Sequence, residues 1–221
     1  MPPSPRWQVG CDLAFAVEQR AIIDLQIAVT AVTAVAGRTV DDSLVVTLDG
    51  QRLPVAVRAL TAPHGGRIHH LEAPPGQHEI TYRATVSGPP DVAPPLGDDA
   101  FERPLALRPS RYCPSDALLG FALARAVGVP ARLVAVDAPG LSPMGFHAVV
   151  EAHVDGGWHV LDPTHLAPRA SLLRIATGRD TADTALADVL AGVATLTRME
   201  VGAVLDGPLP VDEWGALVGL P

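Results

Sequence analysis

Residues 146–164 read FHAVVEAHVDGGWHVLDPT. This stretch consists of two largely apolar runs, 146–154 and 158–161, on either side of Asp155-Gly156. This dipeptide is preferred in two-residue type I′ turns, where both central residues need positive φ. We therefore predict a β-hairpin over these residues.

The turn sets the register of the hairpin and so decides which side chains meet. The first pair beyond the turn is Val154 with Gly157, and counting on brings Val149 opposite Asp162. His147, two residues before Val149, then lies on the same face and diagonal to Asp162. Diagonal neighbours have Cα atoms roughly 7–8 Å apart, which an imidazole can span. We predict that Asp162 orients His147, as a carboxylate orients a catalytic base.

A cysteine stands before the predicted helix that precedes the hairpin. Residues 114–127 have a proline in the first turn and an apolar stripe at helical spacing, and Gly128 ends the segment. Unpaired amides and the helix dipole at this N-terminus would stabilise a thiolate at Cys113 and bind an acyl-transfer oxyanion. Cys113, His147 and Asp162 are thus the candidate nucleophile, base and orienting carboxylate.

Two further stretches carry a family resemblance, residues 128–134 (GVPARLV) and residues 174–180 (RIATGRD). The first resembles the Gly-Ile-Pro-Ala-Arg-x-Val stretch of the transglutaminase-like, papain-related superfamily, and the second resembles a stretch of its bacterial members. Residues 146–151 are similar to the strand that holds the family's catalytic His. Residues 157–164 are similar to its Trp-to-Asp-Pro-Thr segment, which carries the Asp. The resemblance implies a Cys113–His147–Asp162 triad in a bacterial protein.

The region of the nucleophile departs from the family pattern. Residues 109–116, PSRYCPSD, resemble a stretch that lies well upstream of the nucleophile in bacterial relatives. The helical segment that usually precedes the nucleophile has no counterpart, because only a Pro-rich stretch precedes Arg111. We interpret this as the loss of an internal segment, which leaves Cys113 near the vacated position. The assignment of Cys113 as nucleophile therefore rests on its position relative to the later motifs and not on a local motif.

The first 87 residues contain short apolar segments separated by turn residues such as Asp49-Gly50 and Gly65-Gly66. Candidate strands are residues 13–17, 22–29, 44–48, 54–57, 67–71 and 78–86. The pattern predicts an antiparallel, sandwich-like β domain over residues 1–87. Residues 88–110, rich in Pro and Gly, are predicted to be a linker. Residues 111–221 are predicted to form a shortened transglutaminase-like core of helix plus antiparallel sheet, whose tail adds one strand. The predicted class is α+β.

Composition narrows the possible partners. The chain has 24 acidic and 16 basic residues, all of the latter Arg, for a net charge of −8. This charge, without any basic cluster, argues against a nucleic-acid partner. The start of the chain shows no signal-peptide pattern, and the apolar segments are interrupted by Arg and Pro. We expect a cytoplasmic protein with no membrane partner and no cofactor.

The histidines and the second cysteine have simpler interpretations. Cys11 is predicted to be a buried structural thiol, since two free thiols are the default in a reducing compartment. A metal site is a weaker alternative, because the candidate ligands are six residues apart and match no compact motif. These ligands are His147, His153, His159 and His165.

The motifs together predict a cysteine acyl-transfer enzyme that acts on peptide or glutamine amide carbonyls through a thioacyl intermediate. Water as acceptor gives hydrolysis and an amine gives transglutamination, with a protein or peptide as substrate. The alternative is a degraded relative that keeps the fold as a binding or scaffold module without a working nucleophile. The missing segment favours this alternative.

Overall fold

The computed structural model describes residues 5–30, 37–52, 57–62, 65–89, 103–104, 106–107, 124–213 and 215–220. Strands make up 58% of the described residues and helices 6%, and no described helix reaches seven residues. The predicted α+β class is therefore wrong, and the described protein is nearly all β. The α content was expected from residues 114–127, of which only 124–127 are described; residues 124–126 are helical.

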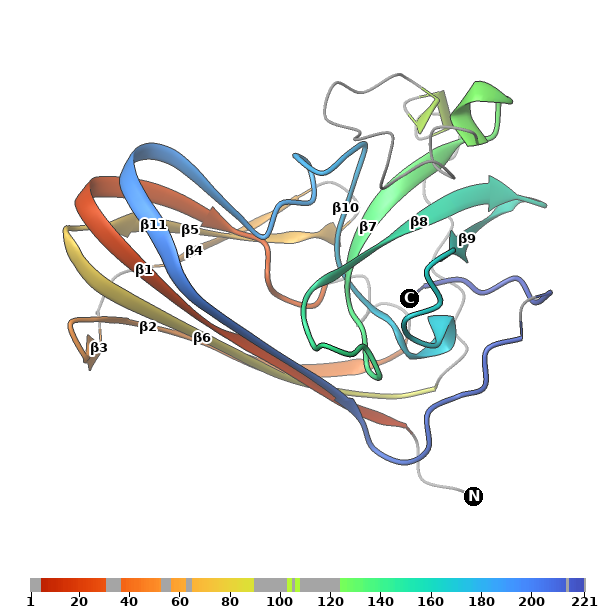
Figure 1. Cartoon of the computed structure of the whole chain (residues 1–221), viewed down its shortest axis with the longest axis horizontal. Coiled ribbons are helices and arrows are strands. Elements are labelled where there is room, and N and C mark those ends of the chain that lie inside the picture. The colour runs from red at the N-terminus through yellow and green to blue at the C-terminus, as the bar shows by residue number, and fades with distance from the viewer. Residues whose placement is uncertain are drawn as a thin grey trace.

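The larger of two sheets has seven antiparallel strands, in the order β3-β2-β6-β1-β5-β4 with β11 on the other side of β1. Figure 1 shows its longest strands side by side, with β1 and β11 bending back at one end. The strands are β1 (Arg6–Leu25), β2 (Thr39–Leu48), β3 (Gln51–Arg52), β4 (Arg58–Thr61), β5 (Arg67–Ala73), β6 (Gly76–Ser87) and β11 (Ala187–Leu205).

Strand β1 builds the core of this sheet because its buried residues alternate. Every second side chain from Trp7 to Val17 is buried, and the alternation resumes from Ala21 to Leu25. The sequence predicted two separate strands here, but the chain runs through exposed residues 18–20 without ending the strand. Cys11 lies in this core and is 2% exposed, which confirms the predicted buried thiol.

The last long strand returns to the beginning of the chain. β11 pairs antiparallel with β1 along its whole length, from Trp7 opposite Leu205 to Leu25 opposite Ala187. The strand predicted for the tail is confirmed, although it begins earlier than expected. Residues from both ends of the chain thus build one sheet, and the limits of the predicted domains stay a prediction.

The smaller sheet has the order β10-β7-β8-β9. Its strands are β7 (Ala131–Asp137), β8 (His147–Val154), β9 (Gly157–Leu161) and β10 (Leu173–Gly178), and the short 3-10 helix η2 (Arg169–Ser171) precedes β10. The predicted hairpin is confirmed as β8–β9. Asp155 and Gly156 have φ of 51° and 83°, as a type I′ turn requires. The register runs from Val154 opposite Gly157 to Val150 opposite Leu161, as predicted.

The two faces of the small sheet carry separate apolar clusters. One cluster contains Val134, Val136, Val149 and Val160, and Leu220 from the C-terminal tail completes it. The opposite cluster contains Ala131, Leu133 and Val150, and Ala124 from the short helical segment packs against it. The described end of the predicted helix therefore lies on the second face.

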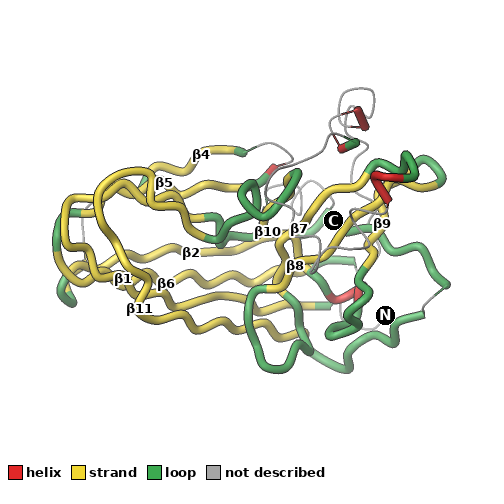
Figure 2. Tube along the Cα trace, turned by 45° about the horizontal axis from the view of Figure 1, so that its top comes forward, coloured by secondary structure: helices red, strands yellow, loops and turns green. Residues whose placement is uncertain are grey.

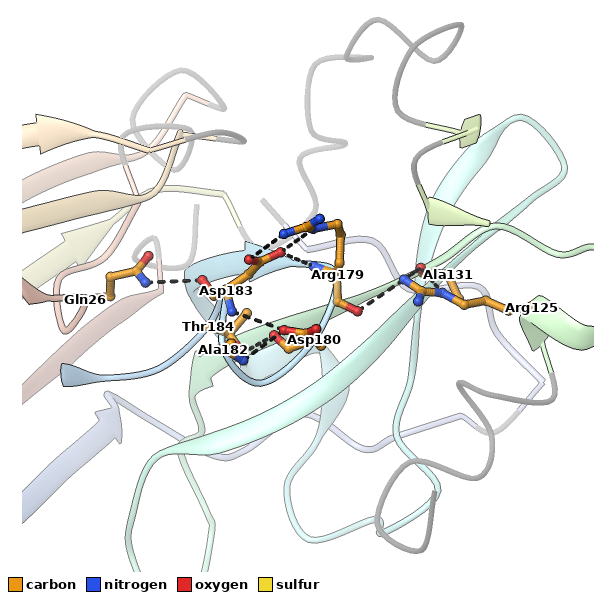
Figure 3. Close-up of polar contacts among 8 residues, drawn as sticks. All are labelled: Gln26, Arg125, Ala131, Arg179, Asp180, Ala182, Asp183 and Thr184. Carbon is orange, nitrogen blue, oxygen red and sulfur yellow. Dashed lines mark hydrogen bonds and ion pairs between the residues drawn. The ribbon is translucent and has the colours of Figure 1, made fainter. Parts of the chain in front are cut away.

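The loop between β10 and β11 connects this helical segment with both sheets (Figure 3). The side chain of Gln26, just after β1, donates to the carbonyl oxygen of Asp183 at 3.2 Å. Arg125 donates to the carbonyl oxygens of Ala131, at 3.0 Å, and Arg179, at 3.2 Å. The Arg179 guanidinium pairs with the Asp183 carboxylate, with Nε 2.8 Å from Oδ2. These contacts fix the orientation of the small sheet against the large one.

A direct contact between the sheets adds to this connection. The Trp7 indole nitrogen donates to the carbonyl oxygen of Ser171 at 3.1 Å, and Leu173 belongs to the core of the large sheet. Within the described ranges, none of the helices has the length and apolar character that a membrane crossing requires.

Candidate active site

The structure brings together two of the three predicted site residues. Nε2 of His147 lies 3.1 Å from Oδ2 of Asp162, a hydrogen-bonding distance. His147 is the first residue of β8, and Asp162 directly follows the last residue of β9. Both side chains lie on the face of Val149 and Val160, as the hairpin register predicted. The predicted pairing of His147 with Asp162 is confirmed as a contact.

Asp162 is held in one orientation by its neighbours. Its second carboxylate oxygen, Oδ1, accepts hydrogen bonds from the backbone amide of Thr164 at 3.0 Å and from the Thr164 hydroxyl at 2.6 Å. Burial by itself would raise the pKa of Asp162, but the hydrogen bonds from His147 and Thr164 outweigh it and leave this pKa below its ordinary value. The carboxylate is therefore ionised and fixed, as an orienting group must be. The Asp-Pro-Thr motif thus supplies both the carboxylate and the hydroxyl that holds it.

The imidazole of His147 uses one of its two ring nitrogens for this contact. Nε2 faces the Asp162 carboxylate, which leaves Nδ1 as the nitrogen for a further partner. The His147 side chain is 11% exposed and that of Asp162 only 1%. The ring is thus the accessible member of the pair, and the carboxylate lies behind it.

Cys113, the predicted nucleophile, lies outside the described residues, so its place in a triad stays a prediction. The nearest described part of its predicted helix is residues 124–127. Ala124 there packs on the face of Leu133 and Val150, which is opposite to the face of His147. A thiol at the far end of that helix would have to reach His147 at the edge or the end of the sheet.

A buried ionic cluster supports the sheet beside this pair, and sequence reasoning missed it. Both oxygens of Glu151 are bound: Arg174 donates to Oε1 at 2.6 Å and to Oε2 at 2.9 Å, and Arg132 donates to Oε2 at 2.8 Å. Arg132 also stacks on the Trp158 ring, with 4.0 Å from Cζ to the ring centroid. Burial would raise the pKa of Glu151, but Arg174 and Arg132 outweigh it and lower this pKa to about 2. Glu151 and Arg132 are neighbours on β8 and β7, whereas Arg174 comes from β10.

A second missed element is the C-terminal tail, which is fastened next to Asp162. The backbone amide of Val160, two residues before Asp162, donates to the carbonyl oxygen of Val218 at 2.7 Å. Arg169 pairs with Asp212, with 2.9 Å from Nη2 to Oδ1. Arg169 also donates to the carbonyl oxygens of Glu213 at 2.7 Å and Ala216 at 3.2 Å. This arginine thus holds the tail over the β9 edge.

The metal alternative finds no support in the residues that the structure covers. No group of three or more His, Cys, Asp or Glu side chains among them could hold a metal ion. His147 pairs with Asp162, and His153 lies edge-on against the Trp158 ring, with 5.3 Å between the ring centroids.

Part of the chain matches the model of a known family. Residues 79–163 match the family model of the transglutaminase-like superfamily. The match confirms the superfamily predicted from the motifs, and its span includes Cys113, His147 and Asp162.

The fold recurs in a solved structure. A crystal structure from Cytophaga hutchinsonii, described as a "putative cysteine protease", matches with a TM-score of 0.78 and 23% sequence identity, over 96% of this chain and 94% of that one. At this identity the likeness shows the fold alone. A search of curated proteins gives no match.

Proposed function

We propose that the protein is a transglutaminase-like cysteine acyl-transfer enzyme, with Cys113 as nucleophile, His147 as base and Asp162 as orienting carboxylate. The observation that carries the proposal is the hydrogen bond between His147 and the buried Asp162. That contact leaves Nδ1 of an accessible ring as the nitrogen for a further partner. A cysteine-protease-like chemistry of the superfamily needs such a pair.

The proposed reaction has two halves. Nδ1 of His147 takes the thiol proton of Cys113, and the thiolate adds to the carbonyl carbon of a peptide or glutamine amide. The tetrahedral intermediate collapses, the C–N bond breaks, and His147 protonates the leaving amine or ammonia, so that a thioester remains. Water or a primary amine then attacks the thioester and returns the proton to the cysteine. The lowered pKa of Asp162 keeps that carboxylate ionised opposite the imidazolium formed in each half. We place this chemistry in the cytoplasm, where the thiol stays reduced.

The chain contains its own control for a test of the nucleophile. Cys11 is buried, which raises the pKa of its thiol to about 12, so it should resist alkylation in the folded protein. Brief treatment with iodoacetamide at several pH values, followed by mass spectrometry, would give the labelling rate of each cysteine. We expect Cys113 to react with an apparent pKa at least about one unit below the reference near 8.5. A Cys113 that titrates at the reference value would contradict the proposal.

A second assay distinguishes water from a primary amine as the acceptor of the acyl group. A glutamine-containing peptide with a fluorescent primary amine would report amine incorporation, and ammonia release would report both hydrolysis and transfer. Cys113→Ala should abolish both signals. Since the chain contains no lysine, it cannot act as its own lysine acceptor, and background self-labelling by that route is absent.

One observation favours the alternative of a binding or scaffold module without a working nucleophile. Ala124, the described end of the predicted helix, packs on the sheet face opposite to His147. A thiol kept on that face would not reach Nδ1. In that case Cys113 would label at an ordinary pKa, and Asp162→Asn would leave its labelling rate unchanged.

A further inference from the structure

Strand β11 lies at an edge of the large sheet (Figure 2). It pairs with β1 on one side, and among the described residues no strand pairs with its other side. The strand is 19 residues long and almost wholly exposed. A long edge strand presents a row of unpaired backbone donors and acceptors to which another strand can be added.

The inward face of β11 is an open side of the hydrophobic core. Its residues Val189, Leu196 and Met199 lie opposite Ile23, Phe15 and Leu13 of β1, which are at most 2% exposed. These three β11 side chains are nevertheless 42%, 40% and 47% exposed. These three side chains are open to contact with another molecule, whereas Ala194, Val201 and Leu205 on the same face pack against the core.

Strand β11 contains no proline, a residue that commonly blocks edge pairing, and its charged residues are Asp188, Arg198 and Glu200. A register shift at Thr197 and another at Gly192 bend the strand. The regular part of its pairing runs from Arg198 to Leu205, and Met199 lies near one end of this part.

Arg198 and Glu200 in that part carry opposite charges, and within the chain Arg198 lies 3.6 Å from the Glu79 carboxylate of β6. Arg198 and Glu200 lie on the outer face, opposite Ala14 and Asp12 of β1, with Met199 between them on the inner face. When two β11 strands pair antiparallel about a twofold axis at Met199, each Arg198 stands opposite the Glu200 of the second copy. The two Met199 side chains then meet on the inner face and extend the core. A parallel, in-register pairing would instead oppose like charges, which is unfavourable.

We propose that the exposed edge of β11 is a self-association interface, in which a second copy of this chain pairs antiparallel about Met199 with two reciprocal Arg198–Glu200 ion pairs. The twofold arrangement is closed, so it gives dimers and not filaments. Because the bulge at Thr197 limits the regular ladder, the buried area is small and the dimer should be weak, with a dissociation constant on the order of 10 μM. This inference does not depend on the proposed catalytic activity.

Sedimentation velocity of the full chain from about 1 to 200 μM tests the interface, a range chosen to bracket the expected constant. The wild type should change from monomer to dimer over this range. Glu200→Arg opposes two arginines, and Arg198→Glu opposes two glutamates, so each should raise the dissociation constant at least about tenfold. The double variant Arg198→Glu/Glu200→Arg restores opposite charges and should dimerise like the wild type.

Glu18→Arg is the matched control, since Glu18 is an exposed glutamate of β1 outside the proposed pairing. It should leave the dimer unchanged, and circular dichroism would confirm that every variant is folded. If the wild type stays monomeric at the highest concentration, the proposal is overturned, and a partner of the β11 edge would have to be a different protein. A dimer that the two single reversals do not weaken, or that the double variant fails to restore, overturns the proposed pairing.

Discussion

Replacing Glu151 by Gln should destabilise the protein strongly, because it breaks a fully buried ionic cluster. The Glu151 side chain is 0% exposed and that of Arg174 is 3% exposed. The pKa of Glu151 falls from its ordinary 4.5 to about 2 in the folded protein. The difference between these values corresponds to about 3 kcal/mol of stability at pH 7. Removing one partner of a buried ion pair costs about 3–5 kcal/mol, so both arguments give the same range.

The stability that Glu151 contributes depends on pH in a predictable direction. A carboxyl group with a lowered pKa in the folded state contributes its full stability above about pH 4.5 and loses it as the pH falls towards 2. The gap in unfolding free energy between wild type and Glu151→Gln should therefore be constant near neutral pH and shrink below pH 4.5. Urea unfolding followed by tryptophan fluorescence can measure it, since Trp158 stacks against Arg132.

Glu72→Gln is the appropriate control for this measurement. Glu72 is 65% exposed and pairs with Arg20 at 3.8 Å, so its loss should cost less than about 1 kcal/mol. The loss in unfolding free energy should be larger for Glu151→Gln than for Glu72→Gln, and it should shrink in acid. If either expectation failed, the buried ionic cluster would not stabilise the folded protein as proposed.

Three further predictions concern the site and its surroundings. Asp162→Asn should lower the alkylation rate of Cys113 at neutral pH at least about tenfold while the protein stays folded; an unchanged rate would separate Asp162 from the chemistry. Arg169→Met should release the tail, with faster amide exchange at Val160 and a loss of about 2–4 kcal/mol in urea unfolding; protection equal to wild type would contradict the tail contact. Burial raises the pKa of Asp137 to about 8, so the folded state disfavours its ionisation. Wild-type stability should thus fall between about pH 4 and 8, and Asp137→Asn should be more stable at pH 7 by about 2–4 kcal/mol; a gain independent of pH would refute this cause.

The hairpin and its site pair were predictable because local chemistry determines them. Asp155-Gly156 specifies a two-residue turn, and a two-residue turn leaves one register. Once the register is known, the period of two along a strand places His147 beside Asp162. No long-range information is needed, so a single sequence was sufficient.

The remaining features depend on contacts that no local pattern encodes. Glu151 stands in an apolar run and its partner Arg174 is 23 residues away, so the sequence does not show that their charges meet. The predicted strands 13–17 and 22–29 belong to one strand, β1, and Gln19 between them pairs with Val193 of β11. The α+β prediction gave too much weight to one helix and too little to strands of 20 and 19 residues.

The pairing of β1 with β11 has a consequence for synthesis of the chain. Trp7 pairs with Leu205, so the β1–β11 ladder stays incomplete until residue 205 has left the ribosome. Contacts of such high sequence separation slow folding, and one edge of β1 stays unpaired until β11 is made. A chain truncated before residue 187 would keep the hairpin with His147 but leave that edge open. We therefore expect early termination to produce aggregation rather than a smaller folded protein.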